Sequence, residues 1–260
     1  MSAACIWRRT TKLARAARRM ASRCREAGKL GGIVAGVVCG VVSVQASPSG
    51  LNNTPTADTC SEQTLVLQTW SGFGYNMQPD NWAGMKYGVF NSADFGGVEI
   101  GGDWKMNGDP SRPPVFQGKY AIGIGEVGPR LGVGIANVST DRKLNGDPMP
   151  YGVLSYDIKG LLRVHAGYGF QKDNEGAFGG LDRTFDLGGL SLMPCFDIIQ
   201  INDQHDALLA PGLKISAPGC KLDGLLGTIL RNVAFETWVN LPSNGNGESY
   251  VAKLDYAIHF

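Results

Sequence analysis

Apolar and polar residues alternate with a period of two along most of the chain after residue 63. In the segment 117–125, Tyr120 and Ile122 share one side of the pattern, while Lys119 and Gly123 share the other. Successive side chains of a β-strand point to opposite faces, so this period predicts strands with one apolar and one polar face. About twelve segments follow the pattern: 64–70, 84–91, 95–106, 117–125, 130–137, 149–158, 161–170, 176–183, 189–199, 207–216, 231–241 and 251–260.

Helical periodicity is rare by comparison. The best candidate for a helix is a short stretch within 221–230, and no long amphipathic helix pattern is found. The chain is therefore predicted to be all-β, with antiparallel strands joined by turns and loops.

The connections between the predicted strands alternate between long and short in the first half of the chain. The long ones include 107–116 and 139–148, whereas 92–94 and 126–129 are short. Outer-membrane barrels combine short periplasmic turns with longer outer loops and an even number of strands. The alternation thus predicts an up-and-down antiparallel transmembrane barrel of about 12 (roughly 10–12) strands, with both ends of the barrel sequence on the periplasmic side. The long connection 217–229 is an exception on that side.

The first 46 residues differ in composition from the rest. A basic stretch is followed by an apolar run over 30–45 and by the small-residue sequence Val44-Gln45-Ala46. These features predict a signal peptide over residues 1–46 that is cleaved after Ala46, with Met20 as an alternative start. Residues 47–62 are polar and are expected to form a flexible segment. Residues 63–260 are expected to form the barrel.

Charge excludes one class of partner. The formal net charge of the 260-residue chain is +1, but the basic residues are concentrated in the predicted signal peptide. The remainder is acidic overall, which argues against a nucleic-acid partner.

The last strand carries a recognisable pattern. Phe260 is the final residue, and Ile258, Tyr256 and Leu254 occupy every second position before it. This arrangement resembles the C-terminal signature of bacterial outer-membrane β-barrel proteins. The resemblance implies a location in the bacterial outer membrane, contact with its lipid, and recognition by the barrel-assembly machinery. The segment 175–197 resembles small barrel proteins linked to exopolysaccharide secretion, so polysaccharide joins small solutes among the partners considered.

Alternation alone does not say which solvent the apolar face meets. A secreted or periplasmic β-sandwich hides that face in a core, whereas a membrane barrel turns it to lipid. Strand lengths of about 9–12 residues suit a tilted span. Aromatic residues such as Trp104, Tyr168 and Tyr250 lie near strand ends on the apolar face, as in an interfacial girdle. These features favour the barrel, and the sandwich acting as a binding module is the alternative.

In a barrel, the polar faces of the predicted strands line the lumen. They carry acidic and basic residues in balanced numbers, which fits either a charge network that stabilises a narrow barrel or a weakly selective pore. The lumen-lining candidates are Glu99, Asp103, Lys105, Lys119, Arg130, Asp157, Arg163, His165, Asp197, Glu236, Lys253 and Asp255.

Candidate catalytic and metal sites are sparse. His165 lies in a predicted strand, but no His-x-Ser or Gly-x-Ser-x-Gly pattern accompanies it, so we interpret it as part of the lumen network. No metal and no cofactor are expected. Cys60 and Cys220 both fall on the predicted periplasmic side and are candidates for a disulfide, which leaves Cys195 as a free thiol facing the lumen; other pairings stay open.

The sequence thus predicts an outer-membrane barrel that acts as a small channel or transporter for an unidentified solute, or as a mainly structural barrel. Enzymatic activity is not expected. An outer-membrane lipid-modifying enzyme is the second alternative, and contact between a serine and a histidine in the folded chain is the observation that favours it.

Overall fold

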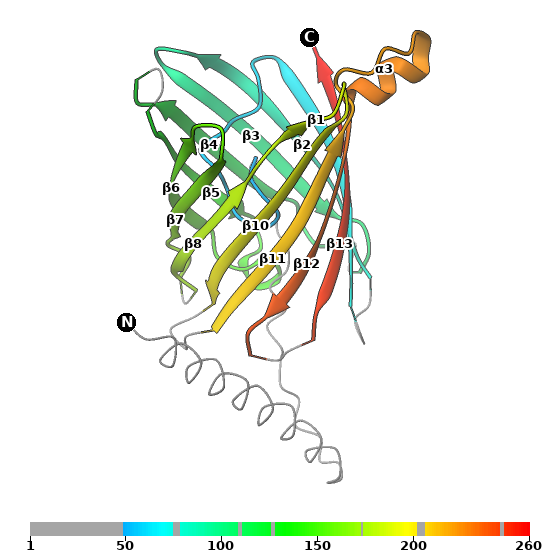
Figure 1. Ribbon diagram of the computed structural model, residues 1–260. Coiled ribbons are helices and arrows are strands. Elements are labelled where there is room, and N and C mark those ends of the chain that lie inside the picture. Colours follow the sequence, from blue (N-terminus) through cyan, green and yellow to red (C-terminus); the bar gives the residue numbers. More distant parts are fainter. Residues whose placement is uncertain are drawn as a thin grey trace, which may run out of the picture. The chain divides into compact units, whose positions relative to one another are not determined.

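The computed structural model describes residues 49–74, 79–108, 111–125, 128–172, 174–201, 206–244 and 247–260. The predicted signal peptide lies outside these residues. Within them, the chain forms one antiparallel sheet of 13 strands that curls into a barrel (Figure 1). The shortest strand, β9 (Phe185–Asp186), covers two residues beside the start of β10, and the remaining strands form the wall.

The wall strands follow one another around the barrel in chain order. They are β1 (Thr64–Gly74), β2 (Asp80–Ser92), β3 (Gly96–Lys105), β4 (Val115–Gly123), β5 (Arg130–Val138), β6 (Met149–Ile158), β7 (Leu162–Gly169), β8 (Gly176–Asp182), β10 (Ser191–Ile201), β11 (Asp206–Ser216), β12 (Val233–Pro242) and β13 (Ser249–His259).

Pairing of the first and last strands closes the sheet. β1 runs antiparallel to β13 over its full length, from Thr64 opposite His259 to Gly74 opposite Ser249. β8 pairs with β10, and β10 pairs with β11, so the wall is continuous around the ring. A closed sheet has no edge strand, which is a requirement for a sheet that spans a membrane.

The apolar face of the strands points outward. In β5, Leu131 and Val133 are exposed, with 57% of the Val133 surface accessible, whereas Gly132 and Ala136 are buried inside. The same alternation places large apolar side chains of every neighbouring strand on the outer surface. A β-sandwich buries this face between two sheets, so the sandwich alternative is wrong. The outward apolar face of a closed antiparallel barrel is the architecture of outer-membrane proteins, and the predicted fold and membrane location are confirmed.

Two ends of the barrel can be distinguished. The terminal end carries the start of β1, the end of β13 and the long connection from β11 to β12, and the loop end carries the connections after β1, β3 and β5. Phe260 extends beyond the wall at the terminal end, where 75% of its surface is accessible and its backbone N–H donates to the carbonyl of Gln63 at 3.1 Å.

Two short helices lie in the connections. α2 (Arg142–Asn145) follows β5 and begins at Asp141, whose carboxylate accepts the backbone N–H groups of Lys143 and Leu144. α3 (Gly224–Asn232) joins β11 to β12 and lies at the terminal end (Figure 1), which matches the helix predicted within 221–230. No helix among the described residues is long and apolar enough to span a membrane.

The outward face of β5 provides a test of the fold. Replacing Val133 by Arg is expected to lower the free energy of unfolding in lipid vesicles by about 2–4 kcal/mol, because a charge near the middle of a span is then exposed to hydrocarbon. Leu144→Arg on α2 is the matched control, since Leu144 is exposed outside the wall. Urea titrations should separate the two variants. Equal stability of both variants would contradict a lipid-facing β5.

Candidate functional site

The described chain begins inside the barrel. Residues 49–60, here called the inner segment, lie within the ring of strands (Figure 1), and Leu51, Thr54 and Ala57 are buried there. The expectation of a flexible segment over 47–62 is therefore corrected for the described residues of the inner segment. Its polar composition is that of a loop, but its polar groups bind the wall and not water.

The inner segment folds back on itself as a tight turn. Gly50 and Pro55 form an antiparallel bridge, and the N–H of Leu51 donates to the carbonyl of Thr54 at 3.0 Å. Asn52 and Asn53 form the tip, and asparagine favours turns because its side chain tolerates and supports their backbone geometry.

Strands β10 and β11 of the wall hold the tip of the turn. The Asp197 carboxylate of β10 accepts the N–H groups of Asn53 and Thr54 at 2.7 and 2.9 Å. The Asn52 amide donates to the carbonyl of Ala210 at 2.5 Å and accepts the thiol of Cys195 at 3.1 Å. Hydrogen bonds to an ionised carboxylate are stronger than those between neutral groups, so Asp197 is the main anchor of the tip.

Two charged wall side chains, Glu99 and Lys119, hold the parts of the inner segment that flank the turn. The Glu99 carboxylate of β3 accepts the N–H groups of Ser49 and Cys60, each at 2.8 Å. The Lys119 ammonium of β4 donates to the carbonyls of Ser49 and Thr56 at 2.6 and 3.2 Å. Glu99 and Lys119 are almost fully buried, and each finds backbone partners of opposite polarity on the inner segment.

Glycines on the inner face of the wall make room for the inner segment. A Cβ atom on Gly180 would lie 2.3 Å from Leu51, and one on Gly212 would lie 2.3 Å from the Asn52 side chain. A Cβ atom on Gly97 would lie 2.3 Å from the Thr59 hydroxyl. These distances are too short for any side chain, so the wall is hollowed where the inner segment lies.

A serine, a histidine and an aspartate form a row across β6, β7 and β8. The hydroxyl of Ser155 contacts Nδ1 of His165 at 2.7 Å, and Nε2 of His165 contacts the Asp182 carboxylate at 2.9 Å. Arg163 donates two hydrogen bonds to the same carboxylate, at 3.0 and 2.9 Å. Ser155 and His165 are directly opposite each other in the strand register, so no short sequence motif could indicate this contact.

In this structure, the row of Ser155, His165 and Asp182 helps to bind the inner segment. Ser155 accepts the N–H of Ala57 at 2.9 Å, and donation of its own proton to Nδ1 leaves the Nε2 proton of His165 for Asp182. Arg163 also reaches the Asp58 carboxylate at 3.0 Å. The hydroxyl of Ser155 and both ring nitrogens of His165 then have partners, and both side chains are buried. The arrangement is that of a nucleophile and its base, but the inner segment covers the serine.

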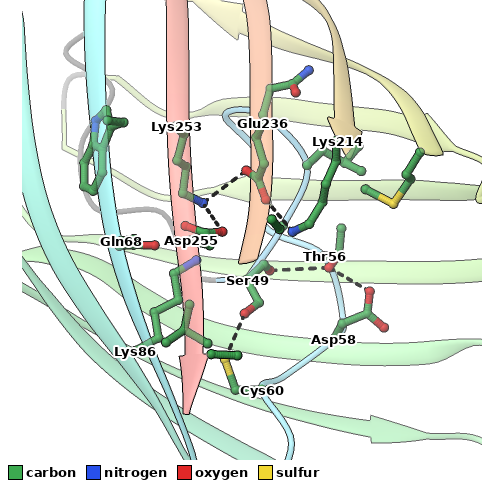
Figure 2. A pocket seen from close by; sticks show the side chains of 18 of the residues that line it. Ser49, Thr56, Asp58, Cys60, Gln68, Lys86, Lys214, Glu236, Lys253 and Asp255 are labelled. Carbon is green, nitrogen blue, oxygen red and sulfur yellow. Dashed lines mark hydrogen bonds and ion pairs between the residues drawn. The ribbon is translucent and has the colours of Figure 1, made fainter. Parts of the chain in front are cut away.

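The space that the inner segment leaves open is a cavity of about 350 Å³. Figure 2 shows Lys86, Lys214, Glu236, Lys253 and Asp255 around it, opposite the inner segment. Glu236 pairs with Lys214 and with Lys253 at 3.1 Å, and Lys253 also reaches Asp255 at 3.2 Å. The charges on this side of the lumen are therefore mostly neutralised in pairs.

Several buried polar atoms of the residues that line the cavity have no hydrogen-bond partner among the described residues. They are two indole donors, Nε1 of Trp70 and of Trp238, and two acceptors, Oε1 of Gln68 and Oδ1 of Asp255. Buried polar atoms are normally paired with protein or water. The cavity is thus suited to hold water or a polar solute.

The structure places most predicted lumen residues inside the wall. The buried or half-buried ones are Glu99, Asp103, Lys119, Arg130, Arg163, His165, Asp197, Glu236, Lys253 and Asp255. Lys105 is half-buried and pairs with Asp80 at 2.6 Å. Asp157 does not join them, because it is exposed at the end of β6, beside the turn to β7.

The predicted disulfide between Cys60 and Cys220 is absent, because Cys60, Cys195 and Cys220 are all free thiols. Cys60 faces Ser49, with 3.5 Å between sulfur and hydroxyl, whereas Cys220 lies in the connection from β11 to α3. Among the described residues, no group of three His, Cys, Asp or Glu side chains could hold a metal ion.

Similarity to known proteins is confined to solved structures. No family description matches the chain, and no curated protein is similar to it. The chain is similar to the solved structure of the KdgM porin, with 12% identity, a TM-score of 0.49, and coverage of 75% of this chain and 99% of the porin. It is also similar to the NanC porin, with 10% identity, a TM-score of 0.46, and coverage of 73% and 98%. For Omp33 of Acinetobacter baumannii the values are 6%, 0.45, 76% and 99%. The fold described above rests on the strand pairing of this chain and not on these likenesses.

Cys60 reports whether the inner segment is in place. Burial, together with the neighbouring Glu99 carboxylate, raises the pKa of Cys60 from 9.0 to about 11. Below pH 9 the folded barrel should therefore hold about 100-fold less Cys60 thiolate than the unfolded chain. Alkylation by a maleimide, in a variant with the other five cysteines replaced by Ser, should be slow at pH 8 and accelerate until the pH passes about 11. A rate at pH 8 equal to that in urea would show that Cys60 is not held in this way.

Proposed function

We propose that the protein is an outer-membrane channel that admits a small polar solute. The observation that carries the proposal is the lumen: it holds a cavity of about 350 Å³, and the residues that line it include charged side chains and buried donors and acceptors without a partner among the described residues. A barrel with a purely structural role has no need for such a space, because an unpaired buried polar atom costs about 1–3 kcal/mol.

The lining favours a solute rich in hydroxyl groups, such as a saccharide. Each hydroxyl is both a donor and an acceptor, and it can therefore serve an indole N–H of Trp70 or Trp238 and an oxygen of Gln68 or Asp255 together. Four basic and three acidic side chains line the cavity, so no sign of charge dominates, and a selective ion pore more often shows one. A neutral saccharide is the solute class we propose.

The row of Ser155, His165 and Asp182 favours a second candidate, an enzyme. A lipid-modifying enzyme needs its nucleophile within reach of lipid, but Ser155 is buried on the inner face of the wall and bound to Ala57. We therefore favour the channel. Labelling of Ser155 by a fluorophosphonate probe in the intact barrel would reverse this preference.

Uptake into proteoliposomes tests the channel. Radiolabelled sucrose should enter vesicles that contain the mature chain or a variant that lacks residues 49–60, and entry should saturate with concentration. Trp70→Phe combined with Trp238→Phe should raise the half-saturating concentration about tenfold, because two hydrogen bonds of about 0.5–1.5 kcal/mol each are lost. Trp104→Phe is the matched control, since Trp104 faces outward.

Three outcomes of this experiment differ in meaning. Absence of entry with both chains would contradict the channel. Entry without saturation would leave a general pore and contradict the saccharide site. An equal effect of the outward control would show that the two inner indoles have no special role.

We also propose that Phe260 is read by the barrel-assembly machinery. Its side chain lies exposed beyond the wall, so it contributes little to packing in the folded state. Phe260→Asp should lower the amount of assembled barrel in cells and leave the unfolding of the assembled fraction unchanged. A normal yield of assembled barrel would contradict the role.

A further inference from the structure

We propose that the inner segment is a removable plug, and that the channel opens when this segment leaves the lumen toward the terminal end. The inference rests on the proposed channel function and names what closes it. The inner face of the wall is then a binding surface whose partner is this chain's own residues 49–60.

The inner segment occupies a built site. Its backbone N–H groups are matched to the carboxylates of Glu99 and Asp197, and two of its carbonyls are matched to the ammonium of Lys119. The wall is hollowed by glycine where the segment packs, as at Gly180 and Gly212. The charges, the hydrogen bonds and the shape of the inner wall thus all fit the inner segment.

The chain connection allows the inner segment to leave. Among the described residues, it is joined to the wall through residues 61–63, which lead into β1 at the terminal end. Most of its bonds to the wall are made by wall side chains, such as those of Asp197, Glu99 and Ser155. Withdrawal therefore leaves the pairing of the strands intact, unlike the removal of a strand.

The composition of the inner segment also suits reversible binding. Its buried apolar side chains are few, chiefly Leu51 and Ala57, and its other buried groups are polar. Water can hydrate these groups after release, and it can hydrate the charged groups that remain in the lumen. A permanent hydrophobic core would instead expose apolar surface on opening, which costs free energy in proportion to its area.

A disulfide can lock the inner segment in place. The thiol of Cys195 lies 3.1 Å from the side-chain oxygen of Asn52, so Asn52→Cys brings two thiols together without changing the wall. The variant is made with Cys5, Cys24, Cys39, Cys60 and Cys220 replaced by Ser, which leaves one possible pair. Asn52→Cys combined with Cys195→Ser is the matched control, because it cannot form the bond.

Single-channel recording in planar bilayers is the measurement. Oxidised Asn52→Cys should lose its openings, and a reducing agent should restore them, whereas the control should respond to neither treatment. The variant without residues 49–60 should stay open, and a synthetic peptide of residues 49–60 added to the terminal side should block it.

The outcomes separate this proposal from the channel itself. If the variant without residues 49–60 assembles and is silent, the channel function fails. If that variant conducts and the oxidised lock conducts equally, the channel stands and the plug is refuted. If the two thiols form no disulfide in the folded barrel, Asn52 does not lie against Cys195 and the plug is refuted as well. The lock keeps the full chain, so it decides the question even if the shortened chain fails to assemble.

Discussion

Charged groups on the inner wall must find partners across the lumen, because lipid surrounds the barrel on the outside. Carboxylates such as Glu99 and Asp197 are almost fully buried, and burial of a charge without hydrogen bonds is costly. The inner segment supplies the missing donors through its backbone. The position of the wall glycines beside the inner segment and the path of the first described residues both fit this requirement.

The same requirement divides the lumen into two regions. Toward β3, β4 and β6, the wall side chains are satisfied by the inner segment, through Glu99, Lys119 and Ser155. Toward β1, β12 and β13, charges pair with each other, as Glu236 does with Lys253, and indole and carboxylate atoms stay unpaired around the cavity. The first region holds a peptide and the second has room for a solute. We regard this division as the basis of a channel that can be closed and opened.

Much of the wall could be predicted from the sequence, because a strand signals itself locally. The period of two identified the wall strands and assigned residues such as Val133 and Lys119 to opposite faces. A membrane barrel and a β-sandwich would both produce this period. Closure of the sheet distinguishes the barrel from the sandwich. It depends on the pairing of β1 with β13, which joins residues from the two ends of the barrel sequence. The terminal aromatic pattern, the alternating lengths of the connections and the aromatic residues near strand ends were the local features that pointed to this outcome.

The contents of the lumen could not be predicted in the same way. The bonds of the inner segment join residues that are far apart in sequence, such as Asn53 and Asp197, separated by 144 positions. Polar residues with Asn, Thr and Pro favour a loop when read alone, and the same residues bind a polar wall when one encloses them. The contact between Ser155 and His165 could not be predicted for a related reason, because it depends on the register of β6 and β7. The expected pairing of Cys60 with Cys220 rested on their shared side of the membrane, which sets no distance between them.

Hydrogen exchange of the assembled barrel tests the central claim, that the inner segment is seated inside the wall. Mass spectrometry of peptides covering residues 49–60 should show slow exchange of the amides of Asn53, Thr54 and Ala57, which donate to wall side chains. Residues 221–223, which are exposed in the connection before α3, serve as the rapidly exchanging reference. Protection of residues 49–60 well above that reference is the result we expect. Exchange as fast as in the reference would place the inner segment outside the lumen and contradict the account.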